Sequence, residues 1–109
     1  MNELEQLIEE VVRFRNERDW EQFHNAKDLA LALSIEASEL NEIFLWKDAA
    51  DADKEQVKDE LADILNYAIL LANKFQLNII EIVHEKLKKN GVKYPVNKAK
   101  GNATKYDKL

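Results

Sequence analysis

Hydrophobic positions recur at helical spacing along most of this chain, and each periodic stretch begins with the same start signal. The signal is a side-chain oxygen at the N-cap position with an acid or amide three residues later, an arrangement at or near a capping box. It occurs at Asn2 with Glu5, Asn25 with Asp28, Asp53 with Gln56, and Asn78 with Glu81. The pattern predicts helices at roughly 3–18, 26–47, 54–75 and 79–90, joined by short connections.

Residues that interrupt helices are confined to the end of the chain. The two glycines and the one proline are Gly91, Pro95 and Gly101, and Gly91 fits the C′ position that stops the last helix. Residues 92–109 lack periodicity and are expected to form an extended basic arm, ordered only where it packs on the body or over a ligand. We therefore expect an all-α, four-helix bundle-like single domain over residues 1–109, with a helical body to about residue 91. Since 109 residues enclose a limited core, packing against a partner subunit is also expected.

The net charge of −5 combines two regions of opposite sign. Residues 1–85 contain 8 Lys or Arg against 20 Asp or Glu, whereas residues 86–109 contain 8 lysines against Asp107 alone. The acidic body argues against binding to a nucleic-acid backbone. The layout suits a polyanionic small molecule that arrives with a divalent metal, with carboxylates for the metal and tail lysines for phosphates. The alternative is a basic tail that only improves solubility.

Two kinds of protein are disfavoured by what the sequence lacks. There is no cysteine, so neither a disulfide framework nor a thiolate metal site is possible. Residues 1–18 are rich in Glu and Arg, and no apolar run approaches the ~20 residues that span a bilayer. We therefore expect no membrane association and a cytosolic location.

Two acidic pairs lie on or beside the apolar stripes of the two middle helices. The pairs are Glu36 with Glu39 on the predicted helix 26–47, and Glu60 with Asp63 on the predicted helix 54–75. Glu36 falls within its stripe, Trp46 lies on the same side as Glu39, and Tyr67 lies one turn beyond Asp63.

Carboxylates on inward faces need a partner. An ionised carboxylate in such a place costs several kcal/mol unless something pairs with it. Any one pair, taken singly, is explained as well by a solvated charged face. Because adjacent antiparallel helices would bring both pairs together, we favour a divalent cation as their shared partner. Oxygen ligands without His or Cys select Mg²⁺ or Mn²⁺ over Zn²⁺.

The same acids carry a resemblance to a known family. The chain resembles the MazG-like all-α nucleotide pyrophosphohydrolases, whose signature is Glu-x-x-Glu on one helix and Glu-x-x-Asp on the next. These motifs read here as Glu36-Ala-Ser-Glu39 and Glu60-Leu-Ala-Asp63. The surrounding stretches 19–47, 60–67 and 93–106 are closely similar to the dCTP pyrophosphatase branch, and the likeness covers nearly the whole chain.

The resemblance implies an obligate oligomer, a homodimer or a homotetramer built as a dimer of dimers. It also implies a nucleoside triphosphate substrate and Mg²⁺, with Mn²⁺ as a substitute. Its metal ligands would be Glu36, Glu39, Glu60 and Asp63. Its substrate-binding residues would be Trp20, Glu21, Gln22, Phe23, His24, Trp46 and Tyr67 for the nucleoside, with Lys86 and Asn90 for phosphates. Many members carry Arg after that Asn, where this chain has Gly91, so tail lysines such as Lys93, Lys98 or Lys105 are further candidates for the phosphates.

The chemistry of the aromatic residues agrees with a nucleoside pocket. Trp20 and Trp46 could supply flat surfaces on which a base stacks, a contact that contributes ~1–3 kcal/mol per base. Tyr67 could pack against the sugar and leave little room for a 2′-hydroxyl, giving a deoxy preference. Packing in the core or an interface is the alternative for all three rings. His24 could contact a base edge or only cap and pack, and His84 is assigned to structure because a di-iron site needs two Glu-x-x-His motifs.

The sequence therefore predicts an Mg²⁺-dependent enzyme that cleaves a nucleoside triphosphate, preferably dCTP-like, to the monophosphate and pyrophosphate. Glu36 or Glu39 is the candidate general base. A pocket built mainly on stacking discriminates bases poorly, so a broad-specificity or modified-nucleotide pyrophosphohydrolase is an alternative. A non-catalytic helical interaction module is the alternative from another class, and four clustered acids argue against it. A helical DNA-binding regulator is disfavoured by the acidic body.

Overall fold

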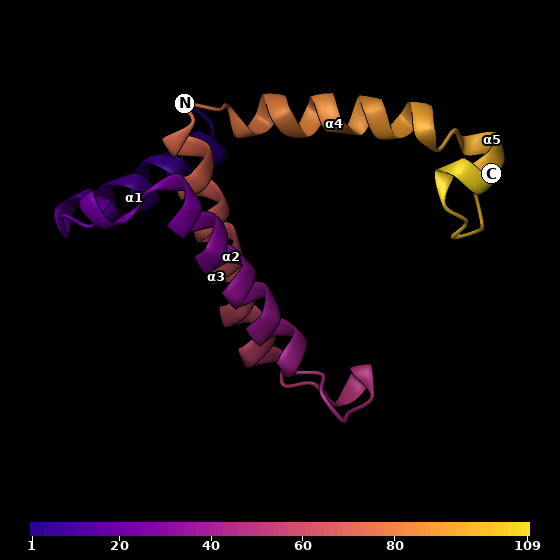
Figure 1. The fold of residues 1–109 in the computed structure, drawn as a ribbon, viewed down its shortest axis with the longest axis horizontal. Helices are drawn as coiled ribbons and strands as arrows, with labels where there is room; N and C mark the ends of the chain where they lie inside the picture. The colour runs from indigo at the N-terminus through magenta and orange to yellow at the C-terminus, as the bar shows by residue number, and fades with distance from the viewer. The chain divides into compact units, whose positions relative to one another are not determined.

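The structure, a computed structural model, describes all residues from Met1 to Leu109 and contains helices without strands. The α-helices are α1 (Glu3–Glu17), α2 (Ala26–Glu42), α3 (Lys54–Lys74), α4 (Ile79–Lys93) and α5 (Val96–Ala99), and the 3₁₀ turns are η1 (Glu21–Phe23), η2 (Ala49–Asp51) and η3 (Tyr106–Lys108). They form two compact units, residues 1–77 and 78–109 (Figure 1). The predicted all-α class is confirmed, with five α-helices in place of four.

Each of the four long helices begins where the sequence indicated. At α1 the Asn2 side chain accepts a hydrogen bond from the backbone N–H of Glu5 at 2.8 Å, and Glu5 accepts one from the backbone N–H of Asn2, which completes a capping box. At α3 the Asp53 carboxylate accepts from the backbone N–H two residues on, rather than three. Side-chain caps three residues ahead of their donors also start α2 and α4, at Asn25 and Asn78.

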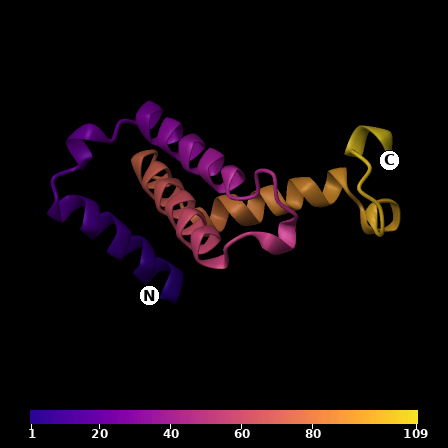
Figure 2. The same cartoon turned by 90° about the horizontal axis from the view of Figure 1, so that it is seen from below.

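In the first unit, α2 and α3 form an antiparallel hairpin and α1 packs against α3. Figures 1 and 2 show the hairpin helices side by side along their length. The most deeply buried residues gather where the end of α1, the start of α2 and the end of α3 meet, and they are Arg15, Leu29, Ile69, Leu70 and Ala72. This small core fixes one end of the hairpin, and with it the register of α2 against α3 further along.

The predicted helix 26–47 is wrong at its C-terminal end. α2 ends at Glu42, and the chain continues in turns with an i→i+3 hydrogen bond from Leu45 N–H to Glu42 O at 3.0 Å. Trp46 has a φ of 61° and is 93% exposed. A non-glycine residue with a positive φ cannot continue a right-handed helix. Trp46 therefore does not extend the face of α2 that carries Glu39.

In the second unit, two expectations about the chain end are wrong. α4 continues through Gly91 to Lys93 and stops ahead of Pro95, because a proline disfavours helical backbone in the residue before it. The residues that follow are not an extended arm. They form α5 and η3, and the rings of Tyr94 and Tyr106 meet edge to face with centroids 6.0 Å apart. An aromatic pair thus organises a segment whose sequence has no hydrophobic period.

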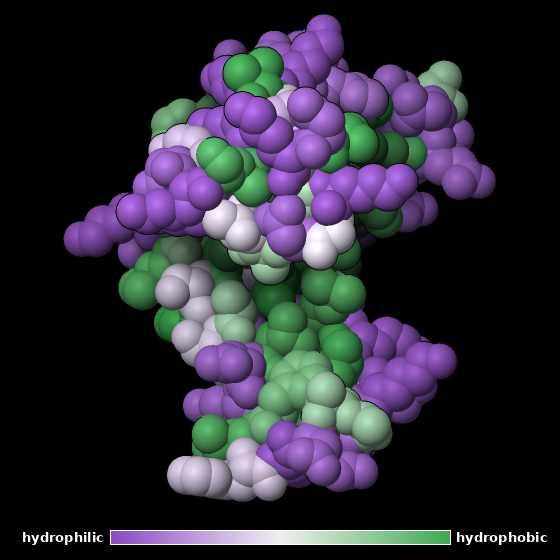
Figure 3. All heavy atoms as spheres, turned by 90° about the vertical axis from the view of Figure 1, so that its right-hand side faces the viewer, coloured by the Kyte–Doolittle hydropathy of each residue, from purple (hydrophilic) through white to green (hydrophobic).

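Many large apolar side chains remain accessible on the chain. Hydrophobic side chains lie open between hydrophilic ones in Figure 3. On α2 and α3 they include Leu31, Ile35, Leu61 and Leu65, each about half exposed. None of the helices combines the length and the apolar character that crossing a bilayer requires. The core of the single chain therefore covers only part of its apolar surface.

Replacing Leu29 with Ala should destabilise the first unit by about 2–5 kcal/mol, because Leu29 is 1% exposed and its loss leaves a cavity at the junction of three helices. Urea unfolding followed by circular dichroism measures the loss. Leu45→Ala is the matched control, since Leu45 is 55% exposed. Equal losses in the two variants would place the core elsewhere.

Candidate functional site

Three acidic side chains converge between α2 and α3. The hairpin places Glu36, in the middle of α2, opposite Glu60 and Asp63, which lie one turn apart on α3. One carboxylate oxygen from each of the three lies within 4.8 Å of the others. The fourth predicted ligand, Glu39, follows Glu36 by one turn and is exposed outside this group. The structure therefore brings three of the four acids into one group, and Glu39 lies near enough to Glu36 to influence its pKa.

The closeness of these carboxylates raises the pKa of Glu36 to about 7. The largest cause is the Glu60 side chain, whose carboxylate accepts a hydrogen bond from protonated Glu36 and so favours the protonated form. Partial burial adds to the effect, as do hydrogen bonding and charge repulsion from Glu39. With all its acids ionised, the cluster therefore opposes folding unless a cation joins it.

The residues present fit a divalent cation. Glu60 Oε2 is buried and has no hydrogen-bond partner, which is costly for a carboxylate oxygen without a cation beside it. Every side chain in the cluster is a carboxylate, the hard oxygen ligand that Mg²⁺ and Mn²⁺ prefer. Opposing acids on two packed helices can thus hold such an ion.

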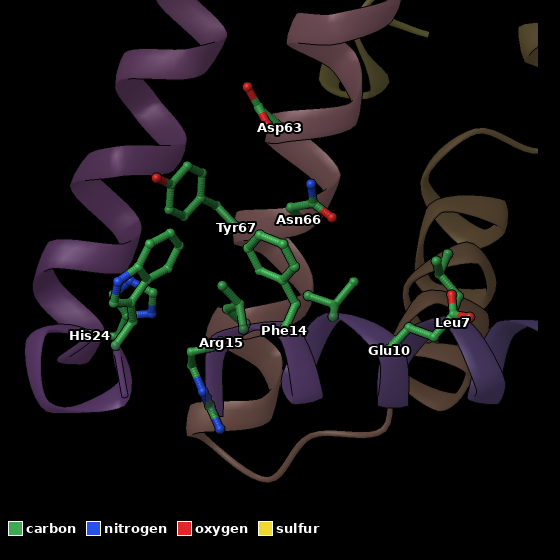
Figure 4. Close-up of a pocket in the computed structure, with 11 residues that line it drawn as sticks. Leu7, Glu10, Phe14, Arg15, His24, Asp63, Asn66 and Tyr67 are labelled. Carbon is green, nitrogen blue, oxygen red and sulfur yellow. The ribbon is translucent and has the colours of Figure 1, made fainter. Parts of the chain in front are cut away.

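A cavity of about 350 Å³ lies beside the acid cluster and shares Asp63 with it. Its volume is in the range of pockets that bind small molecules. Figure 4 shows Asp63 at one end of the cavity and Arg15 at the other, with Tyr67 and Phe14 between them. The lining residues are Leu7, Glu10, Val11, Phe14, Arg15, Trp20, His24, Asp63, Asn66, Tyr67 and Leu70.

Aromatic rings form one wall of this cavity. The Phe14 and Trp20 rings meet edge to face with centroids 5.8 Å apart, and the Trp20 and His24 rings lie 6.4 Å apart. The Arg18 guanidinium sits 3.6 Å from the centroid of Phe14. Flat rings next to an acid cluster suit a ligand with a planar group at one end and anionic groups at the other.

His24 contributes a neutral polar group to the wall. Burial lowers its pKa, and the positive charges of Arg15 and Lys74 lower it further. Its Nδ1 atom is buried and has no hydrogen-bond partner. A neutral imidazole carries one donor and one acceptor, so it can contact the edge of a polar ring.

The other predicted binding residues lie outside the cavity lining. Glu21, Gln22 and Phe23 form η1, where Gln22 Nε2 donates to both Asp19 O and Oδ2 at 3.0 Å and Phe23 is 65% exposed. Trp46 does not line the cavity either. Lys86 and Asn90 lie on α4, in the second unit.

Sequence reasoning missed the contribution of α1 to the cavity. Leu7, Val11 and Phe14 recur at helical spacing along α1, and this spacing was the available signal. Arg15 and Asn66 had no such signal, because a polar residue on a helix is ordinarily solvated.

Three comparisons relate the chain to known proteins. The MazG-like family matches residues 31–109. The chain is 36% identical to dCTP pyrophosphatase 1 of Rattus norvegicus and 33% identical to that of Homo sapiens, over 96% of this chain and 69% of each relative. A pyrophosphatase from Archaeoglobus fulgidus is similar in structure, with a TM-score of 0.80 and 37% identity over 87% of this chain and 94% of that one.

Replacing Glu36 with Gln should stabilise the metal-free protein at about pH 8 and much less at about pH 5. Because the folded-state pKa of Glu36, about 7, exceeds its ordinary 4.5, the folded protein binds the extra proton and loses stability as the pH rises between these values. Thermal unfolding in chelator at both pH values measures the difference. Glu9→Gln, at an exposed position on α1, is the control. A variant less stable than the parent at the higher pH would contradict the repulsion.

Proposed function

The chain belongs to the MazG-like family and is a nucleotide pyrophosphohydrolase, and we propose that it converts a dNTP, preferably dCTP, to dNMP and pyrophosphate with Mg²⁺. The observation that carries the proposal is the position of the acid cluster, which shares Asp63 with an aromatic-lined cavity. A nucleoside in the cavity would direct its phosphates toward the acids.

Glu36, Glu60 and Asp63 would hold Mg²⁺ or Mn²⁺, with Glu39 joining them from the next turn of α2. When bound, the ion neutralises charge on phosphate oxygens and favours ionisation of water. A carboxylate oxygen of Glu36 or Glu39 takes the proton from the attacking water.

The nucleoside would occupy the cavity with its base against Trp20 and His24 and its sugar beside Tyr67. Neutral His24 offers hydrogen bonding to a base edge, and Tyr67 stands one turn from Asp63, between the acids and the aromatic wall. A ring in that place leaves little room for a 2′-hydroxyl, which favours deoxynucleotides. The proposal that Lys86 and Asn90 bind phosphates rests on the family resemblance alone.

A broad-specificity or modified-nucleotide pyrophosphohydrolase is the nearest alternative, because stacking on Trp20 is tolerant of base identity. A non-catalytic interaction module is disfavoured by the electrostatic repulsion within the acid cluster. Three acids within 4.8 Å destabilise an ion-free protein, and an interaction module has no use for that cost.

The working form is proposed to be a homo-oligomer, a dimer or a dimer of dimers. The support is the accessible apolar surface on α2 and α3, at Leu31, Ile35, Leu61 and Leu65, which a second copy can cover. Monomeric proteins of this size seldom leave that much apolar surface open.

Light scattering during size-exclusion chromatography should therefore give two or four times the chain mass of 12.7 kDa. Replacing Leu65 with Glu should shift the population toward smaller species, because a buried charge opposes association. The control is Asp59→Glu, which keeps an acidic side chain at an exposed position of α3. A monomer at all accessible concentrations would contradict the proposal.

Replacing Asp63 with Asn should lower pyrophosphate release from dCTP with Mg²⁺ by about 100-fold or more, because Asp63 belongs to both the acid cluster and the cavity. Asp59→Asn should retain activity, since Asp59 lies on the same helix outside both. Parallel assays with dATP, dTTP and CTP separate a dCTP preference from broad specificity. Undiminished turnover in Asp63→Asn, with Mg²⁺ required by neither protein, would refute the assignment.

A further inference from the structure

Arg15 is the buried charged side chain of this protein. It is 4% exposed, and it lines the end of the cavity away from Asp63 (Figure 4). A guanidinium in such a place is costly unless its donors are paired. The partners of Arg15 therefore show what its burial accomplishes.

The guanidinium joins three elements of the first unit. Its Nε and Nη2 atoms donate to Asn16 Oδ1 at 3.0 and 2.9 Å, and its Nη1 donates to Asn73 Oδ1 at 3.2 Å. Its Nη2 lies 3.8 Å from Glu21 Oε2, beyond hydrogen-bond distance and with a largely exposed carboxylate. Arg15 thus links α1 to the end of α3 and to η1, with its two closest acceptors being neutral amides.

The backbone of Arg15 organises the turn that follows α1. Its carbonyl oxygen accepts hydrogen bonds from the N–H groups of Arg18 and Trp20, both at 3.2 Å. Between them Asp19 has a φ of 53°, so this turn depends on a conformation that side chains rarely adopt. Trp20 and His24, which form the aromatic wall, follow directly from this turn.

We infer that Arg15 is a positioning residue for the nucleoside pocket: its forked side chain fixes the C-terminal end of α1 against the end of α3, and the segment carrying Trp20 and His24 continues from that end. Arg15 reaches no reacting group, because its engaged donors point to Asn16 and Asn73. Loss of the fork lets the aromatic wall move while the acids on α2 and α3 keep their places. Arg15 therefore sets how tightly nucleotide binds and leaves the chemical step unchanged. The inference rests on the proposed function.

Two substitutions at Arg15 separate positioning of the pocket from a purely structural role. A buried charge with neutral partners stabilises a fold poorly, and an apolar side chain of similar size is often tolerated in its place. Arg15→Met should therefore fold. Lysine keeps the charge but has a single nitrogen, which cannot bond Asn16 and Asn73 in the manner of the fork. Arg15→Lys should then behave as Arg15→Met does.

Steady-state pyrophosphate release from dCTP tests the inference in full-length protein. Arg15→Met and Arg15→Lys should each raise KM about tenfold with kcat within about twofold of the parent, the pattern of lost ground-state binding. Arg13→Met, at an exposed arginine of the same helix, should leave both constants unchanged. Asn73→Ala removes one anchor and should raise KM by a smaller factor. The indole N–H resonance of Trp20 should shift in Arg15→Met, while that of exposed Trp46 stays in place.

An unchanged KM in Arg15→Met, or a parental KM restored by Arg15→Lys, would overturn the inference. Should Arg15→Met fail to fold, Asn73→Ala decides, since a raised KM supports the inference and a parental KM overturns it. Failure of the proposed function looks different, because the parent protein itself would then release no pyrophosphate. In that case the dissociation constant of a non-hydrolysable dCTP analogue replaces KM, and equal affinity in parent and Arg15→Met overturns the inference.

Discussion

Mutual repulsion among three carboxylates is the constraint on which the rest of this structure depends. Glu36, Glu60 and Asp63 are held within 4.8 Å by the antiparallel packing of α2 on α3. This repulsion contributes to raising the pKa of Glu36 to about 7. A buried oxygen of Glu60 also has no hydrogen-bond partner. Repulsion among the acids therefore destabilises the middle of the hairpin. The small core around Leu29 stabilises the hairpin at one end.

The remaining parts of the first unit serve the space beside these acids. α1 adds an apolar face and Phe14, and the turn after it adds Trp20 and His24. The cavity is thereby acidic at one end and aromatic along one wall, which matches the two chemically different halves of a nucleotide. Arg15 stands at the other end, where its Nη1 donates to Asn73 Oδ1 and joins α1 to α3. In the proposed function, phosphate chemistry and base binding therefore belong to separate elements that meet at Asp63.

Local sequence signals predicted the parts that local physics determines. The caps at Asn2, Asn25, Asp53 and Asn78 start helices as expected, and the acids at 36, 60 and 63 meet because their spacing places them on facing sides of two helices. The errors have non-local or backbone causes. Trp46, with its positive φ, lies in the turns beyond the end of α2 at Glu42. Gly91 lies within α4, and the rings of Tyr94 and Tyr106 contact each other in the tail. The spacing of Leu7, Val11 and Phe14 marks an apolar face on α1, but that spacing does not say which helix the face packs against, so the α1 wall was missed.

Cation binding by the acid cluster can be measured with Mn²⁺ by electron paramagnetic resonance. Hydrated Mn²⁺ gives a sharp signal that is lost on binding to protein. We expect the parent protein to quench this signal with saturation, Mg²⁺ to restore it by competition, and Glu60→Gln to abolish the quenching. A signal that the parent leaves unchanged, or that Glu60→Gln quenches as fully as the parent, would exclude a cation site at these acids.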